Sequence, residues 1–246
     1  MDVFPVIAQD LAIFPLLCAH GTIRLTFCNP TLMEPISIFV ILVLVFSIII
    51  HEVAHGYAAN ALGDPTARLE GRLTLNPISH IDPLGSVLIP GILVLSGAPI
   101  LFGWAKPVPY NPYNLKNQRW GEALVAGAGP GVNLAIAVFF GLLIRVMSET
   151  GSLTGPFLEL SAYVVYMNIL LALFNLIPLP PLDGSKILKA LLPARLAFSY
   201  AKIEETMMRF GLLVTFLLLF IVMQFLWPYL SYGVGTVFGL LTGFSW

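Results

Sequence analysis

The sequence predicts an all-α polytopic membrane protein that forms a single membrane-embedded domain over residues 1–246, with its core at about 35–230. The first observation is composition, since 58% of the residues are hydrophobic and only 10% are charged. Soluble domains carry about a quarter charged residues. The second observation is a series of long apolar stretches, from which we expect about four to six transmembrane helices.

Four of these stretches reach the roughly twenty residues that cross about 30 Å of hydrocarbon. They lie at about 36–62, 121–146, 158–177 and 206–230. The segment Val3 to Ala19 is shorter and is interrupted by two prolines and Asp10, so whether it spans the membrane stays open. Gly233 to Trp246 is too short to span and is expected at the membrane interface.

The segment Leu84 to Trp104 is apolar enough to span, but Pro90 and Gly91 interrupt its middle. It is therefore expected to be a re-entrant hairpin, whose irregular backbone is tolerated where protein or a wet cavity surrounds it. The segments on either side, Arg68 to Leu75 and Trp104 to Tyr110, are expected to be short and extended, because the first alternates imperfectly and the second is rich in proline.

A metal-binding motif lies at the end of the first stretch. His51, Glu52 and His55 form H-E-x-x-H, and the preceding residues 36–50 contain no charge and only Ser37 and Ser47 as polar groups. Positions i and i+4 share a helix face, so two imidazoles can bind one divalent metal while the glutamate reaches a water on it. A chance triplet is a weaker reading, because ionisable groups are costly in hydrocarbon unless they pair or bind an ion.

A catalytic zinc site normally has three protein ligands, so one more donor is needed. The histidine candidates are His20 and His80. The carboxylate candidate is Asp183, which follows a membrane stretch within Asn175-Leu-Ile-Pro-Leu-Pro-Pro-Leu-Asp-Gly184. The prolines unwind the helix and Gly184 permits a tight path, so Asp183 can turn back toward the membrane. An ordinary Asp-Gly surface turn is the alternative.

These motifs together resemble those of the site-2 protease family of intramembrane metalloproteases. His51 to His55 is similar to the metal motif of that family, and Asn175 to Gly184 is similar to its second motif. Between them, Ala128-Gly-Pro-Gly-Val-Asn133 resembles the family's glycine-proline-asparagine signature. The chain looks like a minimal member, without a PDZ-sized insertion or a regulatory domain.

The resemblance implies that His51, His55 and Asp183 bind one Zn²⁺ ion and that Glu52 is the catalytic base. It also implies that Asn175 assists at the substrate carbonyl and that Asn133 lies near the site. The implied reaction is hydrolysis of peptide bonds in single-span membrane proteins, as in regulated intramembrane proteolysis. The implied location is the lipid bilayer of a prokaryotic cell membrane.

Two further expectations concern the surroundings of the site. Asn76 and His80 could orient ligands or substrate, although capping of a loop is the more favoured role for both. An extended substrate could pair with an edge strand formed by 68–75 or 104–110. If 84–104 is re-entrant, His51, His55 and Asp183 fall toward the same face, whereas a full span would place them toward opposite faces. In the re-entrant arrangement every Lys and Arg except Arg24 and Arg145 lies on the side of the ligands, which predicts an active site toward the cytoplasmic face.

Other classes of function are less favoured. A metal transporter or sensor could use the same His, His and Asp, but it needs no general base and should show further polar steps through the membrane. A catalytically inactive scaffold would be expected to lack one of the four key residues. The net charge of −1 with dispersed basic residues argues against nucleic-acid binding. No function is assigned to Cys18 and Cys28.

Overall fold

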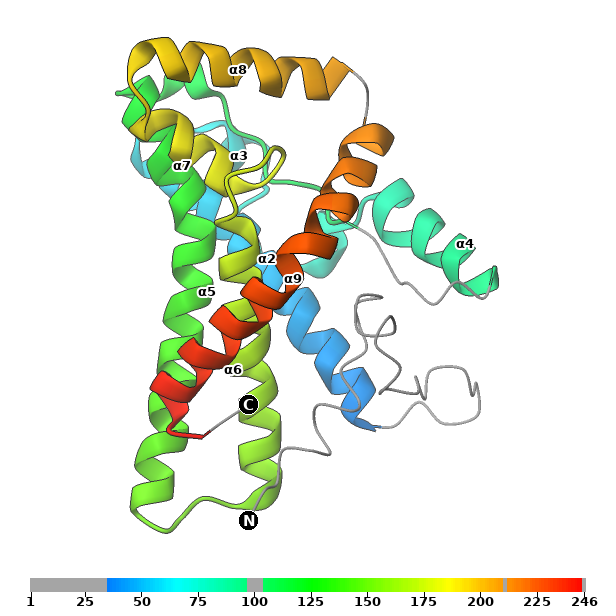
Figure 1. Cartoon of the computed structure of the whole chain (residues 1–246), viewed down its shortest axis with the longest axis vertical. Coiled ribbons are helices and arrows are strands. Elements are labelled where there is room, and N and C mark those ends of the chain that lie inside the picture. Colours follow the sequence, from blue (N-terminus) through cyan, green and yellow to red (C-terminus); the bar gives the residue numbers. More distant parts are fainter. Residues whose placement is uncertain (1–34, 97–103, 210–211, 245–246) are drawn as a thin grey trace.

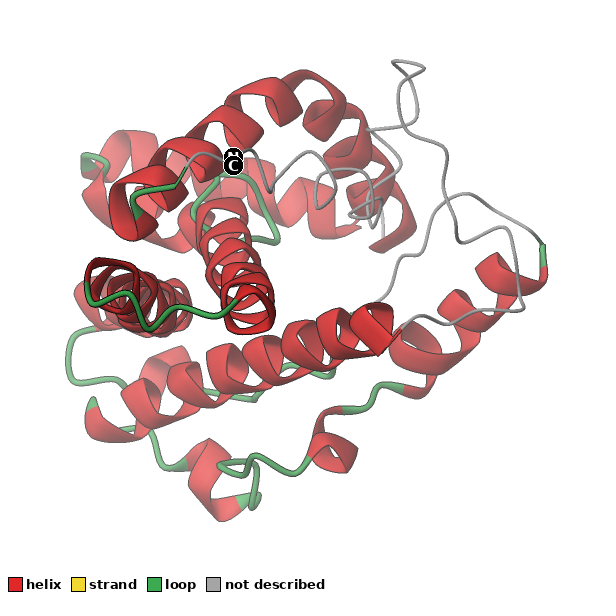
Figure 2. Ribbon diagram, turned by 90° about the horizontal axis from the view of Figure 1, so that it is seen from below, coloured by secondary structure: helices red, strands yellow, loops and turns green. Residues whose placement is uncertain are grey.

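The structure, a computed structural model, describes residues 35–96, 104–209 and 212–244. These residues form helices joined by loops, and no strand occurs among them (Figures 1 and 2). The long helices are α2 (Pro35–Ala61), α5 (Gln118–Glu149), α6 (Gly155–Asn175) and α9 (Leu212–Thr242). The shorter elements are α3 (Thr66–Leu69), η3 (Pro77–His80), η4 (Pro83–Leu88), α4 (Ile89–Leu95), η5 (Pro112–Asn114), α7 (Asp183–Leu191) and α8 (Ala194–Arg209).

Three described helices are long and apolar enough to cross a membrane: Ile38–Ala61, Gln118–Glu149 and Gly155–Asn175. They agree within a few residues with the predicted stretches 36–62, 121–146 and 158–177, and the all-α polytopic prediction is confirmed. The most apolar window of α6 is 61% buried, against 28% in α2 and 22% in α5. Helix α6 is therefore the core helix, and α2 and α5 turn exposed apolar faces outward, as a bilayer requires.

The last long helix differs from its prediction. The predicted stretch 206–230 begins within α8, and α9 continues beyond it to Thr242. The residues Gly233 to Thr242 are thus helical and continue α9 without a break. Val234 and Phe238 are fully buried in the core that α9 shares with α6. This burial offsets the helix penalty of the nearby glycines, which is about 1 kcal/mol each.

The two ends of the segment predicted as a re-entrant hairpin contact each other. The Trp104 N–H donates to Gly85 O at 3.2 Å, and Ser86 Oγ donates to Trp104 O at 2.8 Å. Residues 97–103, which would form the tip, lie outside the described residues. The chain thus returns as a hairpin requires, while its depth in the membrane stays a prediction.

The expected break at Pro90 and Gly91 does not occur, because both residues lie within α4. The turn before them, η4, has π-helical geometry. Proline lacks an N–H and its ring crowds the carbonyl four residues earlier, and a wider π turn accommodates both effects.

The flanking segments agree with their predictions only in part. Arg68 and Leu69 belong to α3, so the expectation of extended chain is wrong there. Residues 72–76 and 104–110 have no helix, as expected, and no strand either. The predictions on Val3 to Ala19, and the residues Cys18, His20 and Cys28, lie outside the described residues.

Candidate metal centre

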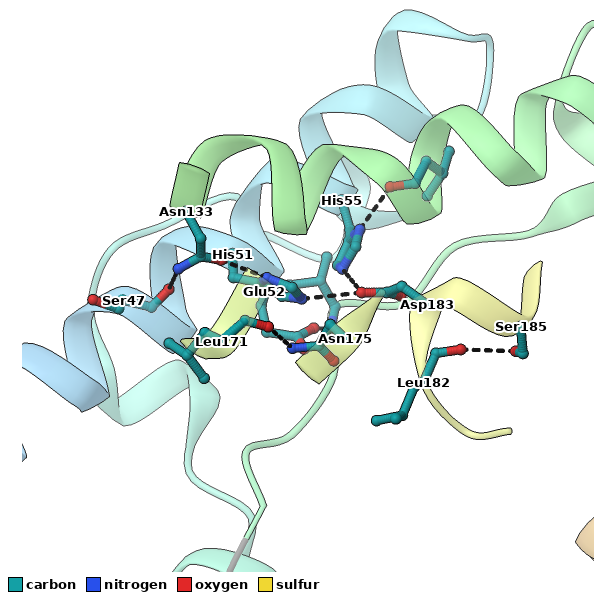
Figure 3. Close-up of polar contacts among 12 residues, drawn as sticks. Ser47, His51, Glu52, His55, Asn133, Leu171, Asn175, Leu182, Asp183 and Ser185 are labelled. Atoms are coloured by element: carbon teal, nitrogen blue, oxygen red, sulfur yellow. Dashed lines mark hydrogen bonds and ion pairs between the residues drawn. The ribbon is translucent and has the colours of Figure 1, made fainter. Parts of the chain in front are cut away.

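The three predicted ligands converge at one point. His51 and His55 lie one turn apart on α2, and Asp183 is the first residue of α7. The Nε2 atoms of His51 and His55 lie 3.1 and 3.2 Å from the same oxygen, Asp183 Oδ2 (Figure 3). All three residues are buried, and their donor atoms lie within 4.8 Å of one another.

Hydrogen bonds on the far side of each ring determine which nitrogen faces the centre. His51 Nδ1 lies 2.7 Å from Asn133 Oδ1, and His55 Nδ1 lies 2.6 Å from Val125 O. Because oxygen accepts in both pairs, each Nδ1 carries its proton and each Nε2 presents a lone pair to Asp183. The two Nε2 atoms and Asp183 Oδ2 all carry lone pairs that repel one another, so they lie this close only when protons or a cation are bound between them. Two imidazoles and a carboxylate are a ligand set that suits catalytic zinc.

Helix α5 provides room for an ion. A Cβ atom on Gly129 would lie 2.5 Å from His55 Nε2 and 2.6 Å from His51 Nε2. Asn133, four residues later, is on the same helix face and contacts His51. The glycine-proline-asparagine signature therefore contributes an open space and a hydrogen-bond acceptor at helical spacing.

Asp183 is positioned by close packing at its own helix. A side chain at Gly184 would collide with the carbonyls of Leu176 and Ile177, so glycine allows α7 to approach the end of α6. Arg119 of α5 caps the other end of α7, donating to Ala190 O at 2.7 Å and Leu192 O at 2.8 Å.

The electrostatic surroundings keep the carboxylate ionised. Burial disfavours the charged form of Asp183, but its close contacts with His51 and His55 and the positive charge of Lys186 outweigh burial and lower the pKa of this carboxyl below its ordinary value. Farther along α7, Lys189 Nζ lies 3.2 Å from Glu122 Oε2 of α5. Burial lowers the pKa of Lys189, but Glu122 and Glu204 outweigh it and raise that pKa. Helix α7 is thus joined to α5 by Arg119 and by the Lys189–Glu122 ion pair, while Asp183 at its start contacts the histidines of α2.

The predicted base and the predicted substrate-assisting residue lie beside the ligands in the view of Figure 3. Glu52 is half-buried, and its Oε2 accepts a hydrogen bond from the Val108 N–H at 3.0 Å. Gly56 makes this approach feasible, because a Cβ there would lie 2.7 Å from Val108 Cγ1. Asn175 is the last residue of α6, and its Nδ2 donates to Leu171 O at 2.9 Å.

Comparison with known proteins identifies the chain. The model of "Peptidase family M50" matches residues 152–218. A Bacillus subtilis protein named "Putative zinc metalloprotease YwhC" is 36% identical over 219 residues, which cover 85% of this chain and 94% of the relative. The chain belongs to peptidase family M50, the site-2 protease family. The resemblance in the sequence is confirmed, and this M50 peptidase is a zinc metalloprotease with zinc as its cofactor.

More distant relatives agree with this family. A Mycolicibacterium smegmatis protein bearing the same descriptive name, Rip2, is 26% identical over 151 residues, covering 61% of this M50 peptidase and 56% of the relative. A Methanocaldococcus jannaschii protein of that description, MJ0611, is 38% identical over 65 residues, covering 26% and 32%. No solved structure matches the chain.

Two residues predicted near the site lie apart from the ligand group of this M50 peptidase. Asn76 is exposed and caps η3 by accepting from Ile78 N–H at 3.1 Å. His80 is buried, and its Nε2 donates to Thr74 O at 2.8 Å. Among the described residues, the grouped metal donors are His51, His55 and Asp183.

Sequence reasoning missed the polar residues behind the ligands. Asn168 of α6 is fully buried, Ser47 of α2 is 5% exposed, and both join the hydrogen bonds around Asn133. The signal was present in the M50 peptidase sequence, since Asn168 is a polar residue inside a predicted span. Ser47 also precedes His51 by four residues, which places both on one face of α2.

Proposed function

We propose that this M50 peptidase hydrolyses peptide bonds of single-span membrane proteins within or beside the bilayer, as in regulated intramembrane proteolysis. The observation that carries the proposal is the position of Glu52 and its neighbouring ligands within α2. The apolar span Ile38–Ala61 contains them, and this supports a substrate that approaches them at membrane depth. A protease for soluble peptides would have no need to bury its ligands in such a helix.

The chain's own groups account for the acid–base steps. Zinc, when bound, supplies a Lewis acid that makes water acidic enough to ionise near neutral pH. Glu52 accepts the proton of the attacking water at its carboxylate and then returns it to the leaving amine. The Asn175 amide, which donates to Leu171 O at the end of α6, is proposed to turn from that carbonyl and donate to the developing oxyanion.

Substrate access is proposed to use the chain beside Glu52. A transmembrane helix hides its scissile amide in its own hydrogen bonds, so it has to unwind locally before cleavage. The segment Trp104–Tyr110 is already non-helical, and its Val108 N–H lies against the catalytic carboxylate. An extended substrate is proposed to align with this segment, using main-chain hydrogen bonds of the kind made in strand addition.

The active site is proposed to face the cytoplasm of a prokaryotic cell. The second half of α2, the first half of α5 and the end of α6 carry site residues, and the loop 150–154 lies at the opposite end of α5 and α6 (Figure 1). Because the chain returns to Gly85 at Trp104, the basic residues of 63–120 and 183–209 share the side of the site. The positive-inside rule supports a cytoplasmic side. The metal transporter or sensor alternative is not favoured, because family membership and Glu52 both point to hydrolysis.

The test is cleavage of a defined substrate by purified protein in lipid vesicles. A single-span protein with tags on both ends is co-reconstituted, and the cut is located by mass spectrometry. We expect cleavage within or next to the span, loss of cleavage with a zinc chelator, and recovery when zinc is added back. Cleavage of only soluble peptides, or zinc-dependent ion flux without cleavage, would overturn the proposal.

A further inference from the structure

A chain of buried polar groups leads away from the metal centre through three helices. Ser47 lies on α2, Asn133 on α5 and Asn168 on α6, and they are 5%, 0% and 0% exposed. Asn133 Nδ2 donates to Asn168 Oδ1 at 2.8 Å and, more weakly, to Ser47 O at 3.4 Å. Asn168 Nδ2 donates to Ser47 Oγ at 3.0 Å and to Val164 O at 2.9 Å. Such a network has to be fully satisfied to be stable in an apolar core.

The orientation of the Asn168 amide follows from its neighbours. Val164 O is a backbone carbonyl, which can only accept, so the NH₂ group of Asn168 has to face it. The Asn168 oxygen then faces Asn133. Reversal of the amide would place two oxygens together, at the cost of an unsatisfied buried group.

The same reasoning fixes Asn133 and then His51. Asn133 meets two acceptors, Asn168 Oδ1 and Ser47 O, so its NH₂ group faces them and its oxygen faces His51. His51 has to donate from Nδ1, and its Nε2 keeps the lone pair that a metal needs. If the Asn133 amide were reversed, the ring would carry its proton on Nε2, and Nε2 could not bind an ion.

Comparison with His55 shows why only His51 needs this chain of hydrogen bonds. The acceptor for His55 Nδ1 is Val125 O, a backbone carbonyl that can only accept a hydrogen bond and cannot become a donor. The acceptor for His51 is a side-chain amide, which can rotate by half a turn. His51 therefore depends on a third residue to hold its acceptor in place.

We propose that Asn168 is a positioning residue that fixes, through Asn133, the nitrogen with which His51 binds zinc. Groups that orient metal-bound histidines change metal affinity by about ten- to hundredfold when they are replaced. The proposal rests on the zinc centre and is independent of which protein is cleaved, because zinc binding is measured without substrate.

The test compares three variants of the full chain in detergent or lipid discs. Asn168→Leu keeps the approximate volume but removes the acceptor for Asn133. Asn168→Asp, when protonated, still accepts from Asn133 and donates to Val164 O. Ser47→Ala removes one hydrogen bond of the network and leaves the orientation of the Asn133 and Asn168 amides unchanged.

Zinc affinity is measured by competition with a chelator, and the Nδ1 protons of ¹⁵N-labelled histidines are observed by NMR in the zinc-loaded protein. We expect Asn168→Leu to weaken zinc binding by about tenfold or more and to shift the His51 Nδ1 proton away from its hydrogen-bonded position. Asn168→Asp and Ser47→Ala should stay within about threefold of the unaltered chain, and His55 serves as an internal reference that should not shift.

Two outcomes would overturn the proposal. One is unchanged zinc affinity and an unchanged His51 resonance in Asn168→Leu. The other is an equal disturbance of the His51 and His55 resonances, which would show that Asn168 acts only through general packing.

Discussion

The carboxylate of Glu52 accepts a hydrogen bond from the backbone N–H of Val108, with 3.0 Å between Glu52 Oε2 and the Val108 nitrogen. This contact joins α2 to the non-helical segment 104–110 across more than fifty residues of sequence. The group proposed to move a proton is thus also the group that holds this segment beside the metal centre. Substitutions of Glu52 have to be read with both roles in mind.

Glu52→Gln separates the two roles. The amide oxygen of glutamine can still accept from Val108 N–H, so the segment and the zinc should be retained. The amide cannot take a proton from water, so cleavage of a transmembrane substrate should fall by at least about a hundredfold. Zinc content and cleavage are measured on the same sample. Normal cleavage by this variant would contradict the assignment of Glu52 as the base.

Gly129→Ala should disrupt the metal centre without disturbing the helix. The added Cβ would lie 2.5 Å from His55 Nε2, so the imidazoles have to move and zinc affinity should fall at least about tenfold. The control is Gly131→Ala, two residues along α5, where nothing lies within 4 Å of the added atom. Elemental analysis and thermal unfolding of both variants provide the comparison. Equal zinc content in the two would show that Gly129 does not border the ion.

Asp183→Asn should weaken zinc binding, because a neutral amide is a poorer ligand than a carboxylate. His80→Gln is the matched control, since His80 is buried but binds Thr74 O and lies outside the ligand group. We expect the first variant to lose most of its zinc during dialysis and the second to keep it. Retention of zinc and activity by Asp183→Asn would mean that the third ligand is another residue.

Asp64 should make the protein sensitive to acid. Burial raises the pKa of Asp64, but hydrogen bonds from Thr66, Asn114 and Asn111 outweigh burial and lower it below the ordinary value of 3.8. The folded state therefore prefers the ionised form, so this stabilisation is present above the unfolded pKa and is lost as the pH falls through the folded pKa. Asp64 clamps the 111–114 loop to the end of α2.

The measurement is the unfolding temperature of the unaltered chain and of Asp64→Asn at neutral pH and at about pH 3. The variant should be less stable at neutral pH, and the difference between the two proteins should shrink in acid. A difference that does not change with pH would show that the charge of Asp64 is not what stabilises the loop.

The predicted orientation can be tested by cysteine labelling after Cys18 and Cys28 are changed to serine. Leu69 and Tyr113 are 77% and 82% exposed and lie before and after the hairpin segment, whereas Ser148 lies at the opposite end of α5. A membrane-impermeant thiol reagent on intact spheroplasts should label Ser148→Cys, and should label Leu69→Cys and Tyr113→Cys only after lysis. Labelling of Leu69→Cys and Tyr113→Cys from opposite sides would refute the re-entrant hairpin.

The amino-acid sequence by itself determined the membrane class, three of the long helices and the chemistry of the site. Apolar length is a local property, and it placed α2, α5 and α6 within a few residues of their ends. The spacing of His51 and His55 is also local, because an α-helix brings positions i and i+4 together. The pairing of these residues with Asp183 came from resemblance to a family, and the structure places the three donors in contact distance of one another.

Only the tertiary structure decided what surrounds those ligands. Nothing local indicates that Gly129 faces the imidazoles, that Val108 lies on Glu52, or that Asn168 contacts Asn133. Each contact joins separate segments of the chain, and each depends on how α2, α5 and α6 pack. Likewise, the helix beyond Gly233 forms against local propensity because Val234 and Phe238 are buried by other helices. Helical periodicity fixes neighbours within one element, whereas contacts between elements depend on side-chain packing across the whole domain.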